Sequence, residues 1–330
     1  MRVASRRVFL LALLAYSQTF PAMYEKIVLV TRKTRLEELV ERFNTRPQAR
    51  FYIEHNGGDF GLYEREHETY HQALTALRGQ LQGLLKMQVI ERSFLPNFLF
   101  AETDLVVTIG IDGLVVNTAK YLDGQPLVAV NPDPQHIDGV LLPFQVTQVQ
   151  AVVRKVLHSQ AKIRAITMAE ASLNDGQRLL AFNDLFIGRQ DHVSARYQIA
   201  FAGQQEKHSS SGIIVSTGAG ATGWLSSLFN MANGMLRGFG AEQANLSRPQ
   251  LTWEANELYF VVREPFISKT SGAGVVCGRV TPDSPLKLES NMPEGGVIFS
   301  DGVAADYLAF NAGAAAEIGL AREKTVLVVA

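Results

Sequence analysis

The fold is decided by residues 105–116, LVVTIGIDGLVV, in which one apolar run passes through a Gly-x-Asp-Gly turn into a second. The first run, Leu105–Thr108, is rich in β-branched residues and predicts a buried strand. The second begins a predicted helix at Leu114–Tyr121, and a further apolar run at Leu127–Val130 predicts the next strand. This order is typical of a parallel sheet, whose ligands bind near the carboxyl ends of its strands.

The pattern differs on the two sides of this run. Upstream, Ile27–Val30 predicts another strand, Phe51–Ile53 a further one, and Tyr63–Val89 a long helix with leucines along one face. Downstream of Phe144, extended runs separated by turn residues predict a series of strands. The predicted fold class is therefore an α/β domain with a parallel sheet plus a β-rich domain. We place the α/β domain at residues 23–146, the β-rich substrate-binding domain at 147–310, and a C-terminal segment that packs back on the first domain at 311–330.

The composition is that of a globular protein. With 330 residues, 47% hydrophobic and 19% charged, the chain is long enough for two domains with a core in each. A net charge of -1 gives no reason to expect nucleic acid or an anionic membrane as a partner. The single cysteine excludes an internal disulfide and is typical of a reducing compartment, so we expect a cytoplasmic protein.

Residues 1–22 form a separate segment. Arginines precede an apolar run at Val8–Tyr16, which has the form of a signal peptide but is too short to span a bilayer, since that takes about 20 apolar residues. Cleavage after Ala22 would place the bulky Phe20 near the cut. Met23 directly precedes the first predicted strand. We favour a start at Met23 and treat residues 1–22 as a leader or a mis-chosen start.

Asp112 is the candidate catalytic residue. Glycines such as Gly110 and Gly113 let backbone N–H groups approach phosphate oxygens, and the helix N-terminus behind them adds partial positive charge. An aspartate there would repel phosphate unless it accepted the proton of an attacking hydroxyl or held Mg²⁺. On these four residues alone, a tight turn in which Asp112 caps the helix is an equal alternative.

Further polar blocks follow in a fixed order. They are Asn131 at a predicted strand end, Phe182-Asn183-Asp184, the stretch STGAGATGW at 216–224, and Asp301-Gly302. This order resembles the NAD kinase family from about residue 24 to the C-terminus. That family carries Gly-Gly-Asp-Gly-Thr, a Val-Asn strand end, Asn-Glu, Ser-Thr-Pro-Thr-Gly-Ser-Thr-Ala-Tyr and Asp-Gly. The related diacylglycerol kinase and phosphofructokinase families share the first motif.

The resemblance implies a two-domain NAD kinase-like architecture and a kinase activity. ATP, bound with Mg²⁺, would donate its γ-phosphoryl group to the 2′-hydroxyl of the adenosine ribose of NAD, which yields NADP. Asp112 would be the general base, and Gly110 and Gly113 would cradle phosphates. The resemblance also implies a homo-oligomer. It assigns the substrate-binding residues as follows: Asn183 and Asp184 to the ribose hydroxyls, Thr222 and Trp224 to the adenosine, and Asn131 and Ser216 to the same cleft.

The chain departs from the family pattern in two groups of positions. Ile111 and Leu114 replace a glycine and the threonine of the first motif, which leaves open a non-catalytic nucleotide-binding or regulatory protein. Ser211 stands where the family has aspartate, and Trp224 replaces a tyrosine. These changes leave open a kinase that acts on another nucleoside, sugar or lipid hydroxyl.

One competing motif is His67-Glu68-Thr69-Tyr70-His71, a literal zinc-protease pattern. Its two histidines would share one helix face, and Glu91 lies at a plausible spacing for a third ligand. The flanking charged residues 64–66 indicate a solvated helix instead. We interpret the pattern as a coincidence and assign no metal ligands.

Overall fold

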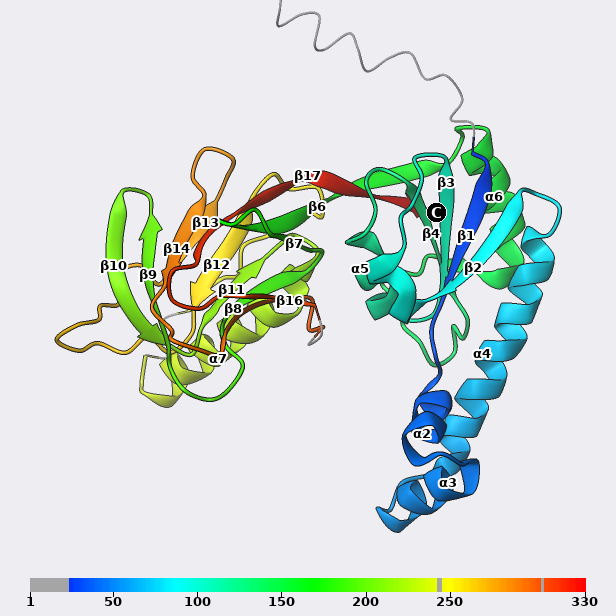
Figure 1. Cartoon of the computed structure of the whole chain (residues 1–330), viewed down its shortest axis with the longest axis horizontal. Helices are drawn as coiled ribbons and strands as arrows, with labels where there is room; N and C mark the ends of the chain where they lie inside the picture. Colours follow the sequence, from blue (N-terminus) through cyan, green and yellow to red (C-terminus); the bar gives the residue numbers. More distant parts are fainter. Residues whose placement is uncertain (1–23, 242–244, 304–305) are drawn as a thin grey trace, which may run out of the picture.

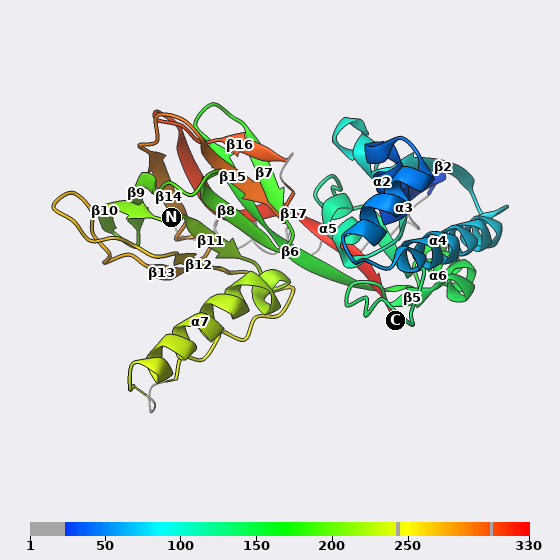
Figure 2. The ribbon, with the colours of Figure 1, turned by 90° about the horizontal axis from the view of Figure 1, so that it is seen from below.

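The computed structural model describes residues 24–241, 245–303 and 306–330. The expectations for residues 1–22 and for a start at Met23 lie outside this range. Two lobes are joined by two long strands, β6 (Lys162–Leu173) and β17 (Ala315–Val329) (Figures 1 and 2). None of the helices in the described part of the chain combines the length and apolar character that a membrane crossing requires.

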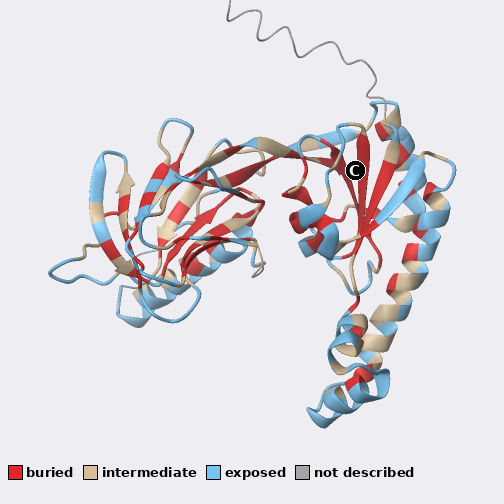
Figure 3. Ribbon diagram, in the orientation of Figure 1, coloured by how far each residue is buried: buried red, intermediate tan, exposed pale blue. Residues whose placement is uncertain are grey.

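The first lobe is built on a parallel sheet in the order β4-β3-β1-β2. Helix α5 (Asp112–Ala119) packs on one face, while α6 (Val149–Leu157) and part of α4 (Phe60–Leu81) pack on the other. Because both faces are covered, the central strands are buried and their sequences are unbroken apolar runs (Figure 3). The strands are β1 (Lys26–Thr31), β2 (Lys86–Glu91), β3 (Asp104–Ile109) and β4 (Pro126–Asn131), with β5 (Phe144–Gln145) beside β4.

Three helices form an arm at the carboxyl edge of this sheet: α2 (Arg35–Phe43), α3 (Arg46–His55) and the start of α4 (Figure 1). The strand predicted at Phe51–Ile53 is wrong, because these residues belong to α3. Thr45 caps that helix by accepting the Gln48 N–H, and the tertiary cluster around Leu36 and Phe60 gives its apolar face a partner. The long helix predicted to Val89 ends at Leu81, and its last residues form β2 instead.

The second lobe contains two sheets packed on one core. One is antiparallel, in the order β13-β12-β11-β8-β15-β16, and the other continues from the first lobe through β17 to β14-β9-β10. Helix α7 (Trp224–Gly238) lies beside them (Figure 2). The strands are β7 (Arg178–Ala181), β8 (Asp184–Arg189), β9 (Ala195–Phe201), β10 (Gln204–Ser210), β11 (Ile213–Ser216), β12 (Leu258–Val262), β13 (Cys277–Val280), β14 (Leu286–Ser290), β15 (Gly296–Ser300) and β16 (Tyr307–Ala309).

Strand β17 ties the two lobes together. It pairs antiparallel with β6 along most of its length and parallel with β4 at Val326 and Leu327, so the end of the chain lies in the first lobe. The predicted fold class, an α/β lobe with a parallel sheet plus a β-rich lobe, is confirmed.

Candidate active site

Asp112 lies at the turn from β3 to α5, at the carboxyl edge of the parallel sheet. It is the first residue of α5, and the cap position is occupied by Ile111, which makes no side-chain cap hydrogen bond. The alternative that Asp112 serves to cap the helix is therefore wrong. Its Oδ1 instead accepts the N–H of Leu141 at 2.7 Å, which orients the half-buried carboxylate against the loop after β4.

The turn accommodates the residues that depart from the family pattern. Ile111 has φ of -107° and ψ of 167°, an extended conformation that a β-branched residue adopts without strain. Gly110 is buried, and a Cβ there would lie 3.0 Å from the Leu114 side chain and 3.4 Å from that of Arg32. Packing at position 110 is thus tight enough that a side chain would displace Leu114 or Arg32, whereas a Cβ on the exposed Gly113 would meet only the Ile111 side chain, at 4.0 Å.

Arg32 is a candidate site residue that sequence analysis missed. It follows β1 directly, and its side chain is only 11% exposed where it packs against Gly110. One guanidinium nitrogen donates to Glu66 at 2.9 Å and another to the Lys33 carbonyl at 2.9 Å, while Nε is buried without a partner among the described residues. A buried donor without an acceptor is unusual and makes Arg32 a candidate for contact with a ligand. The sequence did offer one sign of this role: Arg32 is a cation at the carboxyl end of β1, the strand that pairs with β3.

A pocket of about 530 Å³ opens beside this turn, between α4 and the loop after β4. Its lining includes Ile111, the side chains of Arg32, Arg35 and Arg65, and three carboxylates, from Glu66, Glu68 and Asp133. Guanidinium groups pair well with phosphate oxygens, but here the three carboxylates balance their charge, and Glu66 already pairs with Arg32 and Arg35.

The second lobe contributes a separate pocket of about 400 Å³. Asn183 and Asp184 lie at the start of β8, and Asp184 Oδ1 is buried with no hydrogen-bond partner in the part of the chain that the structure describes. Burial raises the pKa of Asp184 to about 7, and the neighbouring Asp301 carboxylate adds to the rise. The pocket is lined by Asn183, Asp184, Phe186, Trp224, Phe299, Asp301 and Gly302.

Asp301 positions the predicted ribose-binding residues. Its carboxylate accepts three consecutive backbone N–H groups, from Phe182 at 2.9 Å, Asn183 at 2.6 Å and Asp184 at 3.2 Å. Asp301 itself has φ of +53°, and Gly302 follows with φ of +69°. The Asp-Gly pair of the sequence thus forms a turn that places the Asp301 carboxylate against the backbone at the start of β8.

The predicted loop at 216–224 packs closely against the same segment. A Cβ on Gly220 would lie 2.2 Å from the Asn183 carbonyl oxygen, and one on Gly218 would lie 1.9 Å from that of Thr252. These contacts explain glycines in this loop. Thr217 adds a hydrogen bond from its hydroxyl to the Phe182 carbonyl at 2.6 Å.

The other predicted substrate-binding residues differ in their surroundings. Trp224 is exposed, and its ring stacks on Phe186 with centroids 5.8 Å apart, so it forms a wall of the second pocket. Thr222 is also exposed, at the end of a short 3₁₀ helix. Ser216 is fully buried and its hydroxyl donates to the Thr217 carbonyl. Asn131 is buried and uses its amide within its own loop, with Ile137 and Asp133.

The lobes contact each other along α5. Leu114 and Leu141 of the first lobe share a buried cluster with Phe182 of the second. At the other end of α5, Lys120 donates to the Ser300 hydroxyl at 2.7 Å and pairs with Asp306. The Asp112 carboxylate and the Asn183–Asp184 segment therefore flank one inter-lobe cluster.

Among known proteins, this chain resembles solved structures in its fold. No family model and no curated protein matches the sequence. A crystal structure of yeast NADH kinase complexed with NADH matches with a TM-score of 0.55 and 15% identity, over 93% of this chain and 84% of that chain. An NAD kinase from Archaeoglobus fulgidus in complex with ATP matches with a TM-score of 0.52 and 14% identity, over 92% and 93%. The resemblance predicted from the motifs is thus confirmed in the fold, which this chain shares with NAD kinases over nearly its whole length.

Proposed function

We propose that this protein is an NAD kinase-like phosphotransferase, which moves the γ-phosphoryl group of ATP to the 2′-hydroxyl of the adenosine ribose of NAD. The observation that carries the proposal is that Asp112 does not cap its helix and flanks the same inter-lobe cluster as the pocket of Asp184. The shared fold supports it, because the solved relatives are an NADH kinase complexed with NADH and an NAD kinase in complex with ATP.

Each half of the site has a distinct task. Asp184 accepts hydrogen bonds from ribose hydroxyls, Asn183 donates or accepts one through its amide, and the Trp224 and Phe186 rings pack on the base. The Gly110 N–H already donates to the Val130 carbonyl at 3.3 Å, so the phosphate oxygens of the donor are held by the backbone at Gly113 and by the guanidinium of Arg32.

In the reaction, the acceptor oxygen forms a bond to the γ-phosphorus while Asp112 takes its proton. The bond from the γ-phosphorus to the bridging oxygen breaks, and its electron pair leaves with ADP. Little covalent help is needed, so positioning and charge neutralisation account for most of the rate.

Mg²⁺ would be held with the triphosphate, where it would neutralise charge on the phosphates. The phosphate oxygens themselves would be its ligands, because Asp112 Oδ1 already accepts the Leu141 N–H and Oδ2 is the oxygen that takes the proton.

A screen of donors against acceptors tests the proposal on protein that starts at Met23. NAD, NADH, other nucleosides and sugars are offered with ATP, and the products are separated by chromatography. Formation of NADP supports the proposal. Nucleotide binding by calorimetry without any phosphorylated product over hours would favour a regulatory nucleotide-binding protein.

The screen includes a second class of acceptors, because aromatic rings form one wall of the pocket in the second lobe. Phe186 stacks on both Trp224 and Phe299, and Arg263 lies over the Trp224 ring at 5.7 Å. Such a wall accepts any flat or apolar group. Preferential phosphorylation of a different nucleoside or a lipid alcohol would identify this second function.

Replacing Arg32 with alanine is expected to lower kcat/KM for the phosphate donor by roughly 10²-fold, the usual effect of losing one preorganised donor. The expectation follows from the buried Nε beside Gly110. Steady-state kinetics with varied ATP measures it, and Arg46→Ala, on an exposed ion pair with Glu64, is the control. If both variants behave alike, Arg32 does not bind the donor.

The affinity for NAD is expected to rise roughly tenfold between pH 6 and pH 8. Ribose hydroxyls donate to the ionised form of Asp184, and burial raises the pKa of this group to about 7. The fraction of carboxylate able to bind therefore increases as the pH rises through 7. Calorimetry across this range checks the trend, and Asp184→Asn should remove it. A wild-type affinity that does not change with pH contradicts the role of Asp184.

A further inference from the structure

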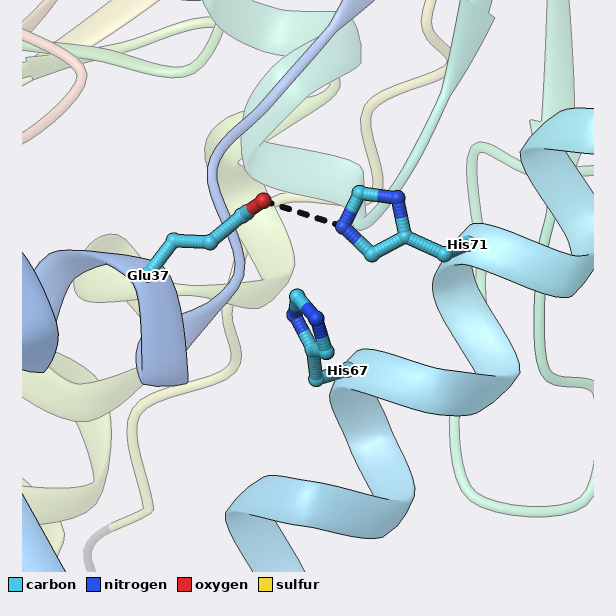
Figure 4. A group of neighbouring side chains, drawn as sticks. All are labelled: Glu37, His67 and His71. Carbon is cyan, nitrogen blue, oxygen red and sulfur yellow. Dashed lines mark hydrogen bonds and ion pairs between the residues drawn. The ribbon is translucent and has the colours of Figure 1, made fainter. Parts of the chain in front are cut away.

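Three metal-ligating side chains meet between α2 and α4, on the arm of the first lobe. Glu37 lies in the first turn of α2, and His67 and His71 lie one turn apart on α4, so that all three point toward one another (Figure 4). Their ligand atoms all lie within 4.8 Å of one another, and no other such group occurs among the described residues. We propose that Glu37, His67 and His71 bind a divalent transition-metal ion of the Zn²⁺ type.

The hydrogen bonds around the cluster leave one ring nitrogen of His67 available to bind a metal ion. Thr34 donates its hydroxyl to Glu37 Oε2 at 3.1 Å and lies 2.9 Å from His67 Nδ1. When the Thr34 hydroxyl donates to Glu37, its oxygen accepts from Nδ1–H of His67, and the lone pair of this tautomer of His67 lies on Nε2. A histidine oriented through its other nitrogen in this way is the usual arrangement of a metal ligand.

The remaining two donors already face each other. His71 Nε2 and Glu37 Oε1 are 3.0 Å apart, and a bound cation would take the place of the proton between them. Glu37 Oε2 stays with the Thr34 N–H, which donates to it at 2.7 Å, so the capping box that begins α2 is preserved. Two imidazole nitrogens and one carboxylate oxygen suit Zn²⁺ and leave one coordination position for water. The side chains of His71 and Glu37 are 43% and 36% exposed, so the ion can reach them from solvent.

A protease function does not follow from this site. Glu68, the expected base of the His-Glu-x-x-His pattern, is exposed and lines the arginine-rich pocket instead. Glu91, the third ligand suggested by spacing, accepts from the Ser93 N–H and hydroxyl. The interpretation of the pattern as a coincidence is therefore revised: its two histidines are ligands, and the third ligand comes from α2.

The cluster shares its two chain segments with the arginines of the first pocket. Glu66, directly before His67, pairs with both Arg32 and Arg35, and Tyr70 Oη accepts the Arg32 N–H at 3.1 Å. An ion that ties α2 to α4 therefore fixes these arginines beside the Gly110 turn. This effect of the ion on the arginines rests on the proposed function. With the ion bound, the KM for ATP should fall in the wild type and remain unchanged in Glu37→Gln.

Metal binding itself is tested without any activity. The protein from Met23 onward, stripped with chelator, is titrated with Co²⁺, followed by visible absorption, and with Zn²⁺, followed by calorimetry and by Tm. We expect a 1:1 site, a visible Co²⁺ band and a higher Tm with Zn²⁺. Absence of binding to the wild type overturns the proposal, whether or not the protein phosphorylates NAD.

Matched variants locate the site. His67→Ala removes one ligand, and Glu37→Gln removes another while its side chain can still form the capping box. Each is expected to weaken Zn²⁺ binding by roughly tenfold or more, because even residues outside the coordination sphere have effects of that size. His192→Ala, an exposed histidine in the loop after β8, should leave binding unchanged. Undiminished binding in Glu37→Gln and His67→Ala shows that the ion binds elsewhere and overturns the proposal.

Discussion

Asp112→Asn is expected to lower turnover by roughly 10²–10⁴-fold, the usual contribution of a general base. Asparagine cannot take the proton of the acceptor hydroxyl, but its side-chain oxygen can still accept the Leu141 N–H that now bonds Oδ1. The loop after β4 and the start of α5 should therefore keep their structure. Single-turnover kinetics with saturating ATP and acceptor measures the chemical step, and the Tm reports the fold.

The control is Asp283→Asn, which removes a carboxylate from an exposed turn in the second lobe. It should leave both turnover and Tm unchanged. Full activity of Asp112→Asn would remove this residue from the mechanism, whereas lost activity together with a much lower Tm would show that Asp112 has a structural role. A selective loss of kcat with an unchanged affinity for both substrates is the result that the proposed function requires.

Asp301→Asn is expected to lower the free energy of unfolding by about 2–4 kcal/mol. Asp301 Oδ1 accepts from Asn183 and Asp184, and Oδ2 accepts from Phe182. Asparagine offers only one acceptor oxygen, so its NH₂ group would face a backbone N–H. Asparagine tolerates the φ of +53° found here, and burial raises the pKa of Asp301, so the loss arises from the hydrogen bonds rather than from the backbone or the charge.

Urea unfolding monitored by circular dichroism measures this change, again against Asp283→Asn, which should stay within about 0.5 kcal/mol of the wild type. Because Asp301 holds the start of β8, the variant should also bind NAD more weakly under conditions in which it remains folded. Unchanged stability would mean that the three N–H groups find other acceptors when the carboxylate is lost.

Local sequence determined the elements that carry the candidate site. The β-branched run 105–108 and the Gly-x-Asp-Gly turn predicted a buried strand and a helix, because strand burial and turn geometry depend on neighbouring residues. The structure has β3 and α5 there. The order of the polar blocks predicted the NAD kinase fold, although the roles of Asp112, Asn183 and Asp184 remain predictions.

Tertiary packing decided what local sequence could not. Phe51–Ile53 has the composition of a strand but is helical, because helical spacing places Ile53 and Ala49 together in the cluster with α2 and α4, while Phe51 and Tyr52 stay exposed. Asp301 meets residues more than a hundred positions earlier in the chain, and Arg32 meets Gly110, only because sheet pairing brings those segments together. The third candidate metal ligand, Glu37, lies 30 positions before His67 and comes from another helix. Spacing along one helix predicts which side chains share a face, but which residue lies opposite that face depends on how the helices pack.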